Sequence, residues 1–74
     1  MIEKDIVVLT VDVPEYDLKA GDIGTVLKAH ADSGYEIEFS ALDGTKIAVL
    51  TLLATQIRPV ESNEIAHVRV IGAA

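Results

Sequence analysis

The chain has 74 residues, of which half are hydrophobic, and its aromatic residues are two tyrosines and one phenylalanine. It has no cysteine, so neither disulfides nor thiolate metal sites reinforce a core that at this length supplies only ~3–5 kcal/mol of stability. The net charge is −6, with six basic residues scattered among twelve acidic ones, which disfavours nucleic-acid binding because phosphates are bound mainly by Lys and Arg. We therefore expect one domain, residues 1–74, with an aliphatic core and no nucleic-acid partner.

The N-terminal residues and the apolar runs indicate where the protein resides. Residues 1–5 lack the cationic start and the cleavage site of a signal peptide. The apolar runs are far shorter than the ~20 residues that cross a bilayer. We therefore expect a cytoplasmic protein that makes no membrane contact.

Two β-branched runs predict the first two strands. Residues 6–11 are too short for a helix and are followed by Pro14, so they are expected to form a strand. Residues 23–30 predict the second strand, with Gly24 placed where a strand bends or approaches another backbone closely. The polar loop between them, residues 12–22, is the longest irregular stretch, and loops of that length are often functional.

The third strand is predicted by strict alternation over residues 35–39, after a turn at residues 32–34. Its apolar side chains share one face, which we expect in the core, and its two glutamates share the other, which we expect in solvent. The core face carries Tyr35, Ile37 and Phe39, and the solvent face carries Glu36 and Glu38.

After a turn at residues 42–45, the chain continues with two more short strands. Residues 46–51 are apolar on both faces, so this strand is expected to be covered on both sides or paired with another subunit. Residues 52–56 leave room for about one turn and predict a 3-10 connector. Residues 57–60 then predict the fifth strand, which a proline ends.

The tail, residues 61–74, begins polar and then becomes rich in β-branched side chains. Residues 65–71 alternate well enough to predict an additional C-terminal strand. One face of that strand would carry Ala66, Val68 and Val70, and the other His67 and Arg69.

Together these elements predict an all-β fold. Five short strands, a long first loop and a 3-10 turn before the last strand are the ground plan of a small SH3-like barrel, complete over residues 1–60. The additional strand of residues 61–74 has no necessary place in such a barrel.

Several stretches carry a resemblance to a known family, and they span nearly the whole chain. The chain resembles domain-of-unknown-function family 4926, a group of short bacterial proteins, and residues 19–39 are more loosely similar to the first hairpin of many SH3-like barrels. The family has no assigned activity, so the resemblance implies a fold and no catalytic residues. By analogy with small proteins that look like partners of neighbouring small genes, it also implies an antitoxin-like role. The stretches are DIVVLT (5–10), PEY (14–16), LKAGDIGTV (18–26), YEIEF (35–39) and IRPV (57–60).

No residue pattern indicates catalysis, a cofactor or a metal. His30 and His67 are isolated in the sequence, whereas a metal site needs several converging ligands. Glu36 and Glu38 are about 7 Å apart along a strand and are better explained as a solvent face than as a glycosidase pair. The chain has neither a Gly-x-Ser-x-Gly elbow nor a phosphate-binding loop. We therefore expect no catalytic, cofactor-binding or metal-binding residue.

Two segments are candidates for protein binding. In the long loop, Tyr16 and Leu18 either present a binding face or fold inward to plug the open end of the barrel, and the sequence leaves both readings open. In the tail, the candidates are Ile65, His67, Val68, Arg69, Val70 and Ile71.

The favoured hypothesis is a non-enzymatic module that associates with other copies of itself, because an exposed apolar strand edge needs a cover. Folding of the tail onto its own barrel is the alternative. A second hypothesis is an antitoxin-like or immunity-like protein whose negative surface binds a basic partner. An enzyme or small-molecule binder is least favoured, because an aromatic-poor chain this short has little with which to build a pocket of ~300 Å³ or more.

Overall fold

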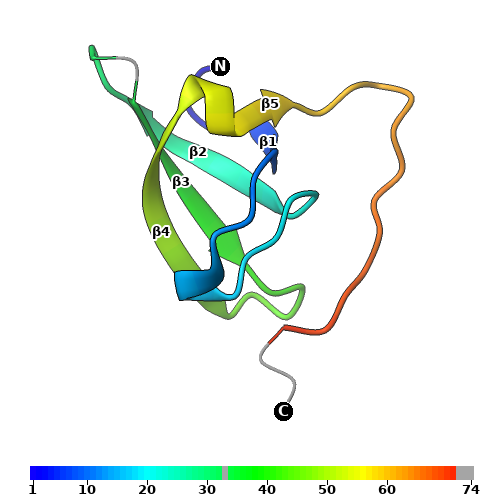
Figure 1. Cartoon of the computed structure of the whole chain (residues 1–74). Coiled ribbons are helices and arrows are strands. Elements are labelled where there is room, and N and C mark those ends of the chain that lie inside the picture. Colours follow the sequence, from blue (N-terminus) through cyan, green and yellow to red (C-terminus); the bar gives the residue numbers. More distant parts are fainter. Residues whose placement is uncertain (33, 72–74) are drawn as a thin grey trace.

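The computed structural model of the chain describes residues 1–32 and 34–71, and within them five strands form one antiparallel sheet (Figure 1). The order across the sheet is β4-β3-β2-β1-β5. Two 3-10 turns accompany the strands: η1, Pro14–Tyr16, in the long loop, and η2, Ala54–Gln56, before the last strand. The prediction of an all-β chain with five short strands and a 3-10 turn is confirmed. The strands are β1 (Ile6–Leu9), β2 (Ile23–Ala29), β3 (Gly34–Ser40), β4 (Lys46–Leu53) and β5 (Ile57–Pro59).

The sheet curls strongly but stays open. β1 pairs with both β2 and β5, and β2, β3 and β4 follow as successive antiparallel neighbours. The two outer strands, β4 and β5, are joined through η2, and no ladder pairs them within the described residues. Figure 1 shows the resulting half-wrapped sheet, with η1 and its loop lying across the open side next to β4.

The core lies on the inner face of this sheet and is entirely aliphatic apart from one ring. The alternation of β3 is confirmed for Ile37 and Phe39, which are almost fully buried, while Tyr35 is half-buried and packs against the same cluster. The buried side chains are Val7, Val8, Leu9, Leu18, Val26, Ile37, Phe39, Ala48, Leu52 and Ile57.

The two glutamates of β3 are less exposed than their alternation predicts. The side chains of Glu36 and Glu38 are 37% and 29% exposed. His30 Nε2 lies 3.5 Å from Glu36 Oε2, and Lys46 Nζ lies 3.3 Å from Glu38 Oε2. Side chains from the neighbouring strand ends therefore cover part of this outer face.

Gly24 allows β2 to pass close over β3. A Cβ atom at this position would lie 2.5 Å from Ile37 Cγ2 and 2.9 Å from Phe39 Cε1, which is shorter than any real contact. The expected close approach at this glycine is therefore present, and it is made with the core side chains of the neighbouring strand.

The predicted additional C-terminal strand is wrong. Residues 61–71 contain no strand, and Figure 1 shows them curving away from the sheet before returning towards its far end. A β-branched segment forms a strand only when it can pair with the edge strand of a sheet. Here a turn at residues 61–64 leads the chain away from the edge strand β5. Ser33 of the predicted turn and residues 72–74 of the predicted tail lie outside the described residues.

Candidate functional site: the anchored tail and the groove between η1 and β4

The first anchor of the tail is a bidentate ion pair at the end of β5. Arg58 donates hydrogen bonds of 2.7 and 2.6 Å from its two terminal nitrogens to Glu64 Oε1 and Oε2. The backbone N–H of Glu61 also donates to Glu64 Oε1, at 2.7 Å. The hydrogen bonds from Arg58 and Glu61 lower the pKa of Glu64 to about 2. This pair closes the turn at residues 61–64 and sets the direction in which the tail leaves the sheet.

The second anchor joins the far end of the tail to the loop before β2. Arg69 donates from Nε to Asp22 Oδ1 at 2.8 Å and from a terminal nitrogen to Asp22 Oδ2 at 2.5 Å. The same terminal nitrogen donates to the carbonyl oxygen of Asp17 at 2.7 Å. Burial opposes ionisation of Asp22, but hydrogen bonds from Arg69 and from the Lys19 N–H outweigh it and lower its pKa.

Between the anchors and just beyond the second one, aliphatic side chains point into solvent. Ile65, Val68 and Val70 are 87%, 81% and 77% exposed, and His67 is exposed as well, whereas Ile71 packs against the core. The six tail residues expected to bind a partner therefore divide into two groups. Arg69 and Ile71 attach the tail to its own sheet, and Ile65, His67, Val68 and Val70 remain accessible.

Past the turn at residues 61–64, the backbone of the tail lies apart from the hydrogen-bonded sheet. Within the described residues, no backbone-to-backbone hydrogen bond is made by residues 65–71, and the last one in the chain joins the N–H of Glu64 to the carbonyl of Glu61. Figure 1 shows residues 65–71 as an extended trace. This segment therefore offers free N–H and C=O groups as well as apolar side chains.

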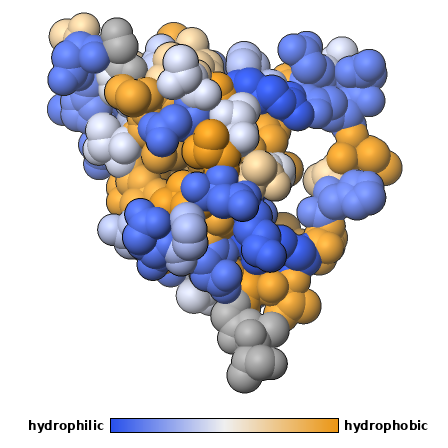
Figure 2. Space-filling model, in the orientation of Figure 1, coloured by the Kyte–Doolittle hydropathy of each residue, from blue (hydrophilic) through white to orange (hydrophobic). Residues whose placement is uncertain are grey.

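An open hollow of about 360 Å³ separates the tail from the sheet. Figure 2 shows the tail standing away from the body of the molecule on this side. The sheet contributes mainly aliphatic residues of β1 and β2, and the tail contributes its first half. The lining residues are Ile6, Val8, Gly21, Ile23, Arg58, Val60, Glu64, Ile65, Ala66 and His67.

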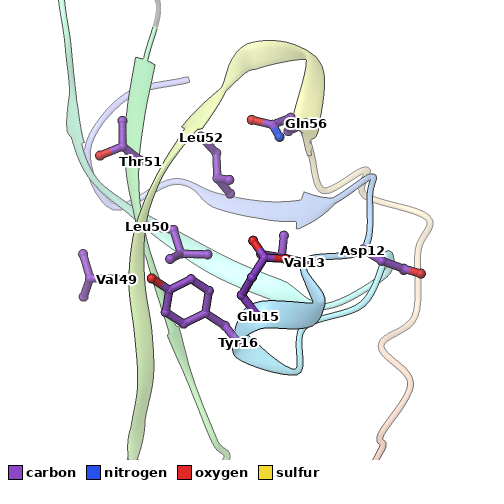
Figure 3. A pocket seen from close by; sticks show the side chains of 9 residues that line it. All are labelled: Asp12, Val13, Glu15, Tyr16, Val49, Leu50, Thr51, Leu52 and Gln56. Atoms are coloured by element: carbon purple, nitrogen blue, oxygen red, sulfur yellow. The ribbon is translucent and has the colours of Figure 1, made fainter.

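A second hollow, of about 470 Å³, lies between the long loop and β4 (Figure 3). We call it the η1–β4 groove. Its lining residues are Asp12, Val13, Glu15 and Tyr16 from the loop, Val49, Leu50, Thr51 and Leu52 from β4, and Gln56 from η2.

The structure separates the two loop candidates. Leu18 is buried in the core, so of the two readings left open the inward one applies to it: it plugs the open side of the sheet and is not available as a binding residue. Reciprocal backbone hydrogen bonds between Val13 and Leu18, of 2.8 and 3.2 Å, turn the loop so that Leu18 points inward. Tyr16 is 48% exposed, and Figure 3 shows its ring pointing from η1 towards Val49 and Leu50.

Two hollows of this size are present despite the low aromatic content, and both are open to solvent. Both hollows exceed ~300 Å³, the lower limit for small-molecule sites. Aromatic content was a poor guide because both hollows form where separate segments of the chain meet. The walls of the hollow beside the tail are mainly apolar, whereas those of the η1–β4 groove are mainly polar.

The titratable side chains that line the hollows are Asp12, Glu15 and Tyr16 in the η1–β4 groove and Arg58, Glu64 and His67 beside the tail. All ten residues of the buried core are hydrophobic, and no polar side chain of residues 1–32 and 34–71 is buried. Within the same residues, no three histidines or carboxylates come together as a metal site would require. No helix in the described part of the chain is both long and apolar enough to cross a membrane.

The residues that hold the tail were not identified from sequence. Asp22 and Arg69 are separated by 47 positions, and no local pattern links them. Arg58 and Glu64 are six positions apart, a spacing with no standard meaning outside a helix. For the groove, the pairing of an aromatic residue with acids around η1 was the one usable signal.

Comparison with known proteins places the chain in a family without assigning it an activity. The family model described as "Domain of unknown function (DUF4926)" matches residues 3–59, which is most of the chain and ends with β5. No curated protein and no solved structure matches. The protein with the anchored tail and the η1–β4 groove is a member of the DUF4926 family.

Proposed function

We propose that the protein is a non-enzymatic binding module that self-associates through residues 65–71. The observation that carries the proposal is the state of this segment: it is held at its far end and at the turn before it, yet within the described residues Ile65, Val68 and Val70 stay exposed and its backbone makes no hydrogen bond. Covering an ordered, exposed apolar segment with another surface is energetically favourable.

The two anchors lower the entropic cost of association. A free tail would lose conformational freedom on binding, at a cost of about 1–2 kcal/mol for each residue ordered. Arg58 and Arg69 each hold a carboxylate through two hydrogen bonds, which restrict the tail before any partner arrives. The segment is thus preorganised for binding.

A second copy of the chain is the partner that the charge pattern favours. The whole chain carries a net charge of −6, so most surfaces of two copies repel each other. Residues 65–71 contain no carboxylate, and their cation Arg69 is neutralised by Asp22. Two such segments can meet antiparallel across a two-fold axis, with backbone hydrogen bonds and aliphatic contacts between them.

A pair of charge-matched variants tests this proposal. Val68→Asp combined with Val70→Asp places two charges in the interface, whereas Ile2→Asp combined with Leu42→Asp places two charges on exposed aliphatic positions elsewhere. Light scattering coupled to size-exclusion chromatography is expected to give a dimer for the wild type and the control, and a monomer for the tail variant. Equal masses for the tail and control variants would contradict the proposal.

A second candidate function is an antitoxin-like or immunity-like protein that binds a basic partner. The η1–β4 groove favours it, because Asp12 and Glu15 line the groove and no cationic residue does. Capture of a basic partner that weakens as salt rises is the corresponding test. For either function we propose a cytoplasmic location in a bacterium, with which the cysteine-free composition agrees.

A further inference from the structure

The η1–β4 groove combines negative charge with an aromatic ring. Asp12 and Glu15 contribute carboxylates, and Asp12 uses Oδ1 to accept a 2.9 Å hydrogen bond from the N–H of Ala20. No Lys, Arg or His lines the groove, and no ion pair joins Glu15 to a cation within the described residues. The groove therefore has an uncompensated negative potential.

The apolar part of the groove suits the stem of a long cationic side chain. Figure 3 shows the Tyr16 ring pointing from η1 towards Leu50 and Val49 on β4, and the Glu15 side chain rising from the same turn. A Lys or Arg side chain can rest its methylene groups on Leu50 while its charged end meets the carboxylate and the face of the ring. Tyr16 and Val49, which are 48% and 39% exposed, extend this apolar surface along the strand.

The groove is elongated along an edge strand. It is lined by the consecutive residues 49–52 of β4, a span of about 10 Å. Successive side chains of a strand point to opposite faces, so a groove that contacts all four follows the edge of the strand rather than one face. β4 is an outer strand of the sheet, and within the described residues no other strand pairs with this edge. An extended segment laid there could form backbone hydrogen bonds with it.

We infer that the η1–β4 groove binds an extended segment of a partner protein that carries lysine or arginine side chains. The segment lies along β4, and its cation is held between Glu15 and Tyr16. The inference deepens the second candidate function by naming the partner chemistry and its site. It is independent of self-association, because none of the tail residues that the structure describes lines the groove.

The test uses the full chain and a fluorescein-labelled peptide of alternating arginine and valine, followed by fluorescence anisotropy. Glu15→Gln is expected to weaken binding about threefold. Tyr16→Ala is expected to weaken it about tenfold, while Tyr16→Phe keeps the ring and stays close to wild type. Glu3→Gln removes the same charge from an exposed residue outside the groove and is the matched control.

Two competitors distinguish a segment from a simple cation. The unlabelled arginine–valine peptide is expected to displace the probe, and a peptide of alternating glutamate and valine is not. Spermidine at the same charge concentration is expected to displace it poorly, because it makes no strand-like hydrogen bonds. Equal displacement by spermidine, equal effects of Glu15→Gln and Glu3→Gln, or absence of binding would each overturn the inference. None of these outcomes bears on the solution masses of the tail variants, so failure of this inference and failure of self-association can be told apart.

Discussion

Arg69 binds the carboxylate of Asp22 through two hydrogen bonds, of 2.8 and 2.5 Å, although the two residues are 47 positions apart. The pair joins the end of the tail to the loop that leads into β2. With the Arg58–Glu64 pair at the other end, it turns a segment outside the sheet into an ordered part of the surface. The proposed interface depends on this order.

Loss of the Arg69 anchor is expected to free the tail without unfolding the sheet. In Arg69→Gln, the side chain can no longer bind Asp22 through two charge-assisted hydrogen bonds. The heteronuclear ¹⁵N NOE of Val68 and Val70 should fall, while that of β2 and β3 stays high. Arg58→Gln is the matched control, because it should loosen residues 61–64 and leave the contact of Arg69 in place. Unchanged values at Val68 and Val70 in Arg69→Gln would contradict the role of this anchor.

Acid is expected to release the tail. The pKa values of Asp22 and Glu64 lie below their ordinary values of 3.8 and 4.5, and that of Glu64 is about 2. A carboxylate with a lowered pKa stabilises the folded state above its ordinary pKa and loses that contribution as the pH falls through the lowered value. NMR relaxation of Val68 and Val70 should therefore show an ordered tail above about pH 5 and progressive release towards about pH 2. Release that begins near neutral pH would contradict the two ion pairs as the cause.

The core face of β3 predicts a sharp contrast between two substitutions. Phe39→Ala removes a buried ring and is expected to lower the free energy of unfolding by about 3–5 kcal/mol. Glu36→Gln changes a half-exposed side chain whose partner is His30, and its effect should stay below about 1 kcal/mol. Urea denaturation measures both, and the reverse ranking would show that the strand faces are assigned wrongly.

Gly24 and Gly34 should respond differently to the same added methyl group. In Gly24→Ala the new Cβ meets Ile37 and Phe39 within 3 Å, so overpacking is expected to cost about 1–3 kcal/mol. In Gly34→Ala the nearest atom, Thr51 Cγ2, lies 3.4 Å away, and the change should be small. The difference between their urea midpoints tests the close approach of β2 to β3.

The five strands could be predicted because the residue pattern of each strand is visible within its own short stretch of sequence. Alternation over residues 35–39 identified Ile37 and Phe39 as core, and β-branched runs identified the other strands to within a few residues. The tail could not be predicted in this way. Its composition resembles a strand, but a strand also needs an available edge, and the turn closed by Arg58 and Glu64 directs the chain elsewhere.

The candidate site was predictable only in part. The aromatic and acidic residues around η1 indicated a binding surface, and Tyr16 does line a groove. The sequence could not separate Tyr16 from Leu18, because the direction of each side chain depends on the backbone contact between Val13 and Leu18. Ion pairs between distant residues, such as Arg69 and Asp22, leave no local pattern.

The most direct test of the central claim is the solution mass of the full-length chain compared with a chain truncated after Glu64. This truncation keeps the Arg58–Glu64 pair and removes residues 65–74. Sedimentation equilibrium from low to high micromolar concentration is expected to give a full-length dimer and a truncated monomer, with matching circular dichroism spectra that establish an intact sheet in both. A full-length chain that stays monomeric at high micromolar concentration, or a truncated chain that still dimerises, would contradict self-association through the tail.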